Sequence, residues 1–280
     1  MISQPGLHII LLKQLFDNCF PKSFKIYLQS VLMLPPIDRF SGHADLYVQH
    51  RIDYPDDLYE FILRAVPHRL TAWDCATGNG QVAGALADRF AQVEATDISE
   101  TQLLLAVQKS NIRYQISPAE HTPFADHTFD LITVAQALHW FNVDAFHREV
   151  RRVAKPGTVI AEWGYGLVQI TPRLDAIMLD FYRNRVGPYW DPQRKYIDDR
   201  YVTLPFPFAG AQRAEFVSRR NWPLDQFLNY LRTWSAVRQY IHENEKDPVI
   251  GLGNELRPIW GDGEREVRFG VFLRMGRVDC

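Results

Sequence analysis

Two carboxylates and the glycine turn between them are the residues of this sequence best placed to do chemistry. Asp74 stands near the end of the short apolar run from Leu70 to Ala76, and the turn Thr77-Gly78-Asn79-Gly80 follows it. Asp97 closes the next apolar run, from Gln92 to Thr96. Glycines let a ligand approach the backbone closely, and an acidic residue after the second run can hold the hydroxyls of a ribose. The spacing therefore predicts a site for a nucleoside-bearing cofactor.

The elements that must position these side chains form a strand, a turn, a helix and a second strand. Both apolar runs are short and bounded by turn residues, which is typical of buried strands. Val82, Leu86 and Phe90 recur at four-residue spacing, so the helix expected from about Gln81 has an apolar face to lay against a sheet. We expect a right-handed crossover, with the unpaired N–H groups of the helix N-terminus facing the crevice where a cofactor binds.

The charge of Asp74 distinguishes between two cofactor classes. The stretch from Gly78 to Ala83 also satisfies the dinucleotide fingerprint, so the turn alone does not choose. A carboxylate at Asp74 would repel a pyrophosphate, whereas S-adenosylmethionine has no phosphate and carries a sulfonium and an ammonium group. We therefore expect Asp74 to bind its amino-acid moiety, directly or through water, and Asp97 to bind its ribose. The alternative is that Asp74 caps a turn and Asp97 caps a helix beginning near Ser99.

At this point the residues resemble a family, the class I S-adenosylmethionine-dependent methyltransferases of type 11. Its first motif is similar to Asp74-Cys75-Ala76-Thr77-Gly78-Asn79-Gly80. The stretches Ile112–Ser117, Phe129–Gln136 and Thr158–Trp163 resemble its next three strands, with Lys155-Pro156-Gly157 as the turn into the last of them. The resemblance covers roughly residues 38 to 278. It implies an α/β, Rossmann-like fold: a seven-stranded, mostly parallel sheet with helices on both faces and an inserted or C-terminal helical cap.

By this resemblance the cofactor is S-adenosyl-L-methionine, and its ligands follow the ends of successive strands. The implied cofactor-binding residues are Asp74, Ala76, Thr77, Gly78, Gly80, Asp97, Ile98, Ala119, Glu120 and Gln136. Ala119 and Glu120 would lie near the adenine. The reaction implied is an in-line displacement at the methyl carbon, which depends mainly on proximity and alignment and needs no metal.

The flanking segments are similar to a narrower group, the trans-aconitate methyltransferase-like enzymes. An N-terminal segment, Phe40–Ala44 followed by Tyr47, Arg51 and Tyr54-Pro55, resembles theirs, although Ile52 stands where a proline is common. Two later segments resemble their substrate side, and these are Gly187–Asp191 and Leu231–Ser235. The similarity implies a small-molecule acceptor, with a carboxylic acid as the leading choice.

The acceptor should lie at the carboxyl end of the fourth strand, where open α/β sheets bind ligands. The substrate-binding candidates are Tyr47, Arg51, Trp140, Trp234 and Arg238, with Arg232, Tyr189, Trp190 and Tyr240 as further possibilities. Arginine suits a carboxylate because its fork is bidentate, but each arginine could equally be a solvated charge and each aromatic a core residue.

His139 is the candidate catalytic base. An ionised carboxylate acceptor needs no base at neutral pH, whereas a phenol or an amine would benefit from one. The alternative is that His139 is a packed, hydrogen-bonded structural residue.

The second half of the chain should supply the cap and the final strands, at about residues 166–280, after a cofactor half at about 70–165. We expect helices over Pro172–Arg185, Pro223–Asn244 and Asp247–Trp260, an irregular lid over Gly187–Phe208, and strands over Ala214–Trp222 and Val267–Val278.

Residues 1–36 do not belong to the expected domain, which spans residues 37–280. Their apolar runs fall short of the roughly 18 residues that span a bilayer, although a membrane-surface helix is an alternative to a misassigned start codon at Met1. We expect residues before Met33 to be dispensable.

The composition of the chain limits the binding partners and the cellular compartment that we expect. The chain has 280 residues, 46% of them hydrophobic, and a formal net charge of −2, which argues against nucleic acid as the main partner. Cys19, Cys75 and Cys280 lie far apart and form no CxxC pair, so we expect no metal site, no disulfide framework and a reducing, cytoplasmic location. Cys75 should be a small buried hydrophobe. Two other functions stay open: a nicotinamide-dependent oxidoreductase and a cofactor-binding protein without transfer activity.

Overall fold

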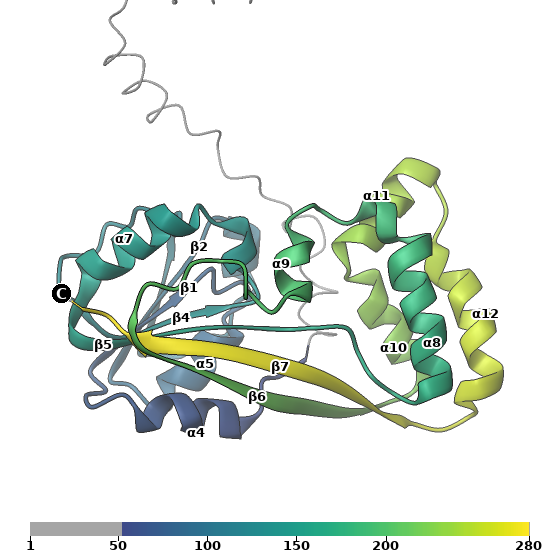
Figure 1. The fold of residues 1–280 in the computed structure, drawn as a ribbon, viewed down its shortest axis with the longest axis horizontal. Helices are drawn as coiled ribbons and strands as arrows, with labels where there is room; N and C mark the ends of the chain where they lie inside the picture. Colours follow the sequence, from purple (N-terminus) through teal and green to yellow (C-terminus); the bar gives the residue numbers. More distant parts are fainter. Residues whose placement is uncertain (1–51, 280) are drawn as a thin grey trace, which may run out of the picture. The chain divides into compact units, whose positions relative to one another are not determined.

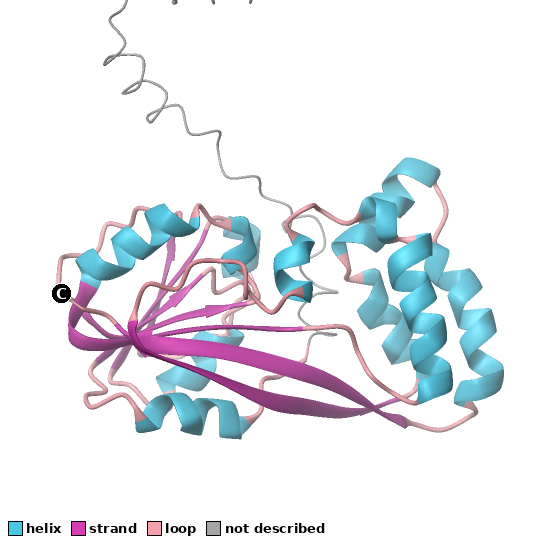
Figure 2. Ribbon diagram, viewed as in Figure 1, coloured by secondary structure: helices cyan, strands magenta, loops and turns pink. Residues whose placement is uncertain are grey.

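The computed structural model describes residues 52–279, which fold around one seven-stranded sheet (Figures 1 and 2). The strands are β1 Thr71–Cys75, β2 Gln92–Asp97, β3 Ile112–Ile116, β4 Phe129–Ala135, β5 Ala154–Tyr165, β6 Ala209–Trp222 and β7 Arg265–Arg277. The first four agree closely with the expected strands, whereas β5 begins four residues before the expected Thr158.

The sheet has the order β3-β2-β1-β4-β5-β7-β6. Strands β1 to β5 pair in parallel, whereas β7 pairs antiparallel with both β5 and β6. The sheet is therefore mixed, and the expectation of a mostly parallel sheet is only partly right, because it holds for β1 to β5 and not for the edge formed by β7 and β6. The reason is that β6 and β7 are long strands joined by a group of helices, so the chain returns along the direction from which it left (Figure 1).

The α-helices are α4 Asp56–Arg64, α5 Gln81–Ala87, α6 Glu100–Leu104, α7 Val143–Val153, α8 Pro172–Asp180, α9 Arg194–Asp198, α10 Leu224–Arg232, α11 Ser235–Asn244 and α12 Pro248–Trp260. Two 3₁₀ turns, Leu138–Trp140 and Gly187–Tyr189, and a π-helical turn, Phe181–Arg185, accompany them. Among residues 52–279, no helix combines the length and the apolar character that a bilayer crossing requires.

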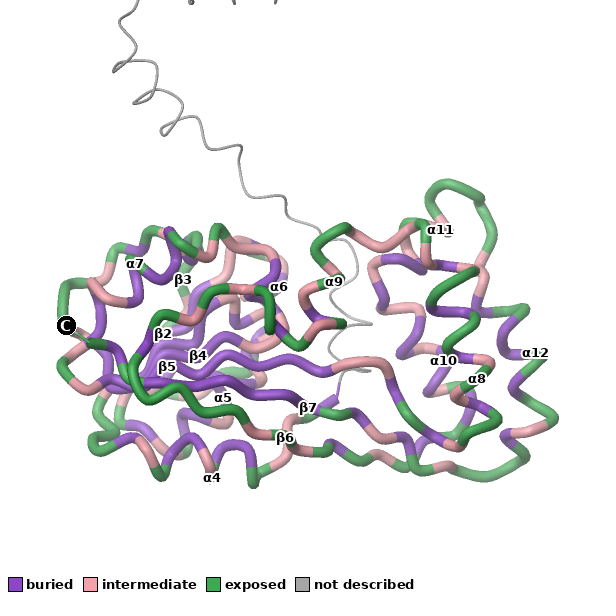
Figure 3. The backbone as a smooth tube through the Cα atoms, viewed as in Figure 1, coloured by how far each residue is buried: buried purple, intermediate pink, exposed green. Residues whose placement is uncertain are grey.

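Helices cover both faces of the sheet, as expected. Leu58 of α4 and Val82 of α5 belong to one buried apolar cluster. Phe146 and Val150 of α7 belong to another, on the opposite side of the strands (Figure 1). The central strands β1, β4 and β5 are almost continuously buried (Figure 3), so the carboxyl ends of β1 and β4 are held on a rigid support.

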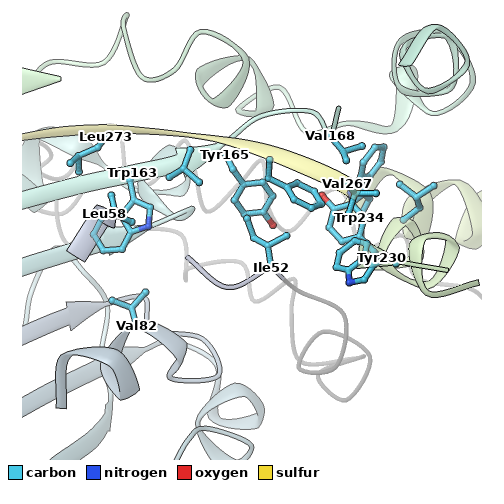
Figure 4. Close-up of a cluster of buried hydrophobic side chains, with 14 of the residues drawn as sticks. Ile52, Leu58, Val82, Trp163, Tyr165, Val168, Tyr230, Trp234, Val267 and Leu273 are labelled. Atoms are coloured by element: carbon cyan, nitrogen blue, oxygen red, sulfur yellow. The ribbon is translucent and has the colours of Figure 1, made fainter. Parts of the chain in front are cut away.

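The first cluster extends from the sheet into the helical group of α8, α10, α11 and α12. It passes from Leu58 along Trp163 and Tyr165 of β5 to Tyr230 and Trp234 (Figure 4). The sheet and these helices therefore share one apolar core.

Three local expectations are wrong. The single helix expected over Pro223–Asn244 is two helices, because the buried Trp234 has extended backbone, with φ −66° and ψ 134°, and its ring packs between Trp190 and Tyr230. The lid over Gly187–Phe208 is not wholly irregular, since it contains α9. Lys155–Gly157 is not a turn before the strand but a bulge inside β5, where the register with β4 shifts.

Candidate active site

Asp74 lies at the carboxyl end of β1 and is almost completely buried. Its carboxylate accepts hydrogen bonds from the hydroxyls of Thr77, at 2.5 Å, and Thr133, at 2.9 Å. Burial raises the pKa of Asp74 to about 7, and the two hydroxyl donors offset part of that rise. The side chain therefore ties the turn to β4.

The turn after β1 has an unusual backbone. Ala76, Gly78 and Gly80 all have positive φ, at 53°, 57° and 76°. A Cβ at Gly80 would collide with the Tyr114 hydroxyl, so only glycine fits there. Gly80 then begins α5, whose first N–H groups lie at the same edge of the sheet.

Asp97 lies at the carboxyl end of β2, beside that turn. It accepts hydrogen bonds from the backbone N–H of Gly78, at 2.8 Å, and of Ser99, at 2.9 Å. Ser99 itself caps α6 by accepting from the Gln102 N–H. Both carboxylates thus support turns. The cap of α6 is Ser99 and not Asp97, so that part of the capping alternative is wrong.

A third carboxylate joins them at this edge. Burial raises the pKa of the Cys75 thiol well above its usual value, and the charges of Asp74, Glu120 and Asp97 raise it further. Cys75 is thus a buried thiol, as expected. The concentration of negative charge, which we call the carboxylate edge (Asp74, Asp97 and Glu120), suits a cationic ligand better than a pyrophosphate.

The loop on the other side of this edge contains Ala119, which is buried, and Glu120, which accepts a hydrogen bond from the Asn142 N–H at 2.8 Å. That bond joins the loop to the N-cap of α7. Ile98, which follows Asp97, is half-buried.

Gln136 follows β4 and has a positive φ of 56°. Its side-chain amide pairs with the backbone of Tyr165, accepting from the N–H at 2.8 Å and donating to the carbonyl at 3.3 Å. Gly164 leaves room for this pair, because a Cβ there would lie 2.7 Å from the Gln136 Oε1. The end of β4 is thereby fixed to the end of β5.

A cavity opens beside Gln136, at the end of β4 where the acceptor is expected to bind, and we call it the acceptor pocket for that expectation. Four segments that are distant in sequence line it: the turn after β4, the end of β5, the segment leading into α9, and the junction of α10 with α11. The lining residues are Gln136, His139, Trp140, Tyr165, Gly166, Trp190, Asp191, Arg194, Tyr230, Thr233, Trp234 and Ser235.

The acceptor pocket contains four residues expected from the sequence to be catalytic or substrate-binding, namely His139, Trp140, Trp190 and Trp234. His139 is largely buried, and its Nδ1 lies 3.3 Å from the Tyr201 hydroxyl. Tyr47 and Arg51 lie outside the described residues.

The other two arginine candidates do not line the pocket. Arg238, on α11, is absent from its wall. Arg232 donates to Asp247 at 2.8 Å and borders a different cavity. Tyr189 and Tyr240 pack on each other, with ring centroids 4.9 Å apart.

Sequence reasoning missed Arg194, which does line the pocket. Its position inside the expected irregular lid provided no helical or strand pattern that would have oriented its side chain. The one available signal was that Arg194 lies close in sequence to Trp190, which was already a substrate-binding candidate.

Comparison with known proteins identifies the fold and its chemistry. A family profile described as a methyltransferase domain matches residues 73–161, which include the glycine turn and both aspartates. A Dictyostelium discoideum protein classed as a methyltransferase is 33% identical over 251 residues, covering 86% of this chain and 95% of that protein. The chain belongs to the S-adenosylmethionine-dependent methyltransferases.

Other relatives of this methyltransferase agree. A solved structure from Anaeromyxobacter dehalogenans, described as a type II methyltransferase, is 36% identical with a TM-score of 0.76, covering 81% of this chain and 98% of that one. A Mycobacterium tuberculosis protein described as an uncharacterized methyltransferase is 31% identical over 175 residues, covering 62% of this chain and 67% of its own length. The cofactor of the methyltransferase is S-adenosylmethionine, and the oxidoreductase interpretation is wrong.

Proposed function

We propose that this methyltransferase transfers a methyl group from S-adenosylmethionine to a small-molecule carboxylic acid in the acceptor pocket. One observation carries the proposal: Gln136 lines the pocket and follows β4, the strand that pairs with β1 next to Asp74. An acceptor in the pocket therefore adjoins the cofactor edge. The resemblance of the flanking segments to the trans-aconitate methyltransferase-like group supports an acid as the acceptor.

The cofactor binds across the carboxyl ends of β1, β2 and β4. Gly78 and Gly80 allow its close approach, and the carboxylate edge favours its sulfonium and ammonium charges. Asp97 holds the ribose, and Ala119 with Glu120 borders the adenine. The full proposed set is Asp74, Ala76, Thr77, Gly78, Gly80, Asp97, Ile98, Ala119, Glu120 and Gln136.

Bound S-adenosylmethionine supplies a methyl carbon attached to a positively charged sulfur. The pocket residues hold the acceptor so that one carboxylate oxygen faces this carbon, and such alignment can contribute about 7 to 11 kcal/mol. The C–O bond forms while the C–S bond breaks, and the sulfur keeps the electron pair of the broken bond. Since the acid is already ionised, the pocket need not remove a proton.

We further propose that the helical group and the segment around α9 act as the cap of a methyltransferase domain spanning residues 37–280. Trp140 and Trp234 of the pocket wall come from opposite sides of this arrangement, the first from the turn after β4 and the second from the start of α11. Together with Trp190, they exclude water from the acceptor.

The test is a product screen with the full chain, S-adenosylmethionine, and panels of carboxylic acids, phenols and amines. We expect release of S-adenosylhomocysteine with acids, and mass spectrometry should find the methyl ester. An Asp97→Ala variant serves as the cofactor-binding control and should need more S-adenosylmethionine for the same activity with every acid. Products found only among phenols or amines would overturn the carboxylate assignment.

A further inference from the structure

Arg194 is the arginine that faces the acceptor pocket, and aromatic rings hold its side chain in place. Its guanidinium carbon lies 4.7 Å from the ring centroid of Trp190 and 5.4 Å from that of Tyr182. The Trp190 indole N–H donates to the Tyr182 carbonyl at 3.2 Å, which fixes the stacking ring. Only 19% of the Arg194 side chain is exposed. The guanidinium is therefore oriented before any ligand arrives.

Residues 52–279 occupy only the Nε edge of that guanidinium. Its Nε donates to the Tyr182 hydroxyl at 2.9 Å, and the same hydroxyl donates to Asp198 at 2.7 Å. The Nε also lies 3.5 Å from Asp198. Within residues 52–279, neither terminal Nη group makes a hydrogen bond or an ion pair. Arg194 thus brings a planar pair of donor groups to the pocket wall, with no described residue bonded to them.

Such a pair matches a carboxylate, which can accept two parallel hydrogen bonds from one guanidinium. The acidic side chain on the same wall, Asp191, already interacts within the protein. Thr233 and Ser235 add neutral hydroxyls to the wall. Among the lining residues that the structure describes, Arg194 is therefore the one arginine or lysine available to an anionic ligand.

We propose that Arg194 anchors a carboxylate of the acceptor other than the one that is methylated. The inference rests on the proposed function and narrows its substrate class to acids with at least two carboxylates. The reason is chemical: a bidentate guanidinium withdraws charge from both oxygens of the group it holds. A carboxylate on Arg194 is thus a poor nucleophile, so the reacting oxygen belongs to a second carboxylate of the same molecule.

The test measures binding without turnover, by calorimetric titration of the full chain with S-adenosylhomocysteine present. Matched probes are succinate and its monoamide, succinamate, followed by propane-1,2,3-tricarboxylate. We expect wild type to bind the most favoured polyacid about 10- to 100-fold more tightly than the monoamide, the range for hydrogen bonds to charged groups. Arg194→Gln should abolish this preference, and Arg194→Lys, which keeps the charge without the fork, should restore part of it.

The control is Arg232→Gln, since Arg232 borders another cavity and pairs with Asp247. It should keep the preference for the polyacid. Binding of S-adenosylhomocysteine and the melting temperature should be unchanged in Arg194→Lys. If wild type shows no preference for polyacids, or if Arg194→Gln keeps that preference, the inference is wrong.

The two proposals can fail separately. Polyacid binding that depends on Arg194, without formation of any methyl ester, would sustain the anchor and overturn the proposed function. Methylation of monoacids as efficient as that of polyacids, with a KM that Arg194→Gln leaves unchanged, would sustain the proposed function and overturn the anchor.

Discussion

The hydroxyl of Tyr201 lies 3.3 Å from the Nδ1 of His139, and His139 lines the acceptor pocket. Tyr201 is fully buried, and this burial, together with the charge of Glu162, raises the pKa of its phenol, which is therefore protonated. The phenol proton needs an acceptor, and the Nδ1 of His139 is placed to take that role. This relationship favours the imidazole tautomer with its proton on Nε2, a hydrogen-bond donor rather than a base.

The first prediction concerns His139 as a donor. We expect His139→Gln to keep carboxylate methylation largely intact, because glutamine can also donate a hydrogen bond. If His139 acted as a general base, its loss would reduce the rate by about 10² to 10⁴. Steady-state rates with the best acid found in the screen decide between these outcomes.

Tyr201→Phe tests the same relationship spectroscopically. Removal of the hydroxyl should shift His139 toward a mixture of tautomers, which ¹⁵N chemical shifts of the imidazole report. An Nδ1-protonated His139 in wild type would contradict the assignment.

The second prediction concerns the pH dependence of stability at Asp74. Its pKa rises on folding from 3.8 to about 7, so the folded state binds this proton more tightly than the unfolded state does. The resulting stability is fully present below about pH 4 and is lost as the pH rises to 7. Relative to wild type, Asp74→Asn should therefore gain stability across this range, by up to roughly 4 kcal/mol. Urea unfolding at several pH values measures the difference.

Asp130 provides a control of opposite sign. Burial opposes its ionisation, yet hydrogen bonds from Lys155 and the backbone of Thr71 and Leu70 lower the pKa of Asp130 overall. Its contribution is present at neutral pH and is lost as the pH falls through the folded-state pKa. Asp130→Asn should thus be more destabilising at pH 7 than at low pH. If the stability difference from wild type changed with pH in the same direction for both variants, the opposite pKa shifts of Asp74 and Asp130 would be refuted.

The third prediction concerns cofactor affinity. Asp97→Ala should weaken binding of S-adenosylmethionine by about 1.5 to 3 kcal/mol, the range for hydrogen bonds to a charged group. Calorimetric titration gives the value, and circular dichroism checks that the fold persists. Unchanged affinity would mean that Asp97 does not bind the cofactor and serves only to hold the backbone of Gly78 and Ser99.

The fourth prediction concerns the contact between β4 and β5. An added methyl group at Gly164 would lie 2.7 Å from both the Gln136 Oε1 and the Phe272 ring, so Gly164→Ala should cost about 1 to 3 kcal/mol of stability. Methyl transfer should fall as well, because Gln136 would move. Gly270→Ala is the matched control, since a Cβ there meets nothing within 4 Å. Equal melting temperatures for the two variants would count against a tight contact at Gly164.

The sequence by itself determined the cofactor half of the protein. The runs expected at Leu70–Ala76 and Gln92–Thr96 are β1 and β2 to within a residue or two at each end. Asp74 and Asp97 lie at their carboxyl ends, as predicted. This part could be predicted because local properties decide it: an apolar run predicts a buried strand, and two closely spaced glycines predict a turn.

Tertiary structure decided the acceptor side and the far edge of the sheet. His139 and Tyr201 are 62 positions apart, and Arg194 reaches the pocket only because Trp190 and Tyr182 hold its side chain there. The order β5-β7-β6 likewise depends on which long strands pair after the helices have packed. Contacts of this kind form between segments that have no fixed spacing along the chain. Local periodicity therefore carries no information about them, and only the packing of the whole domain selects them.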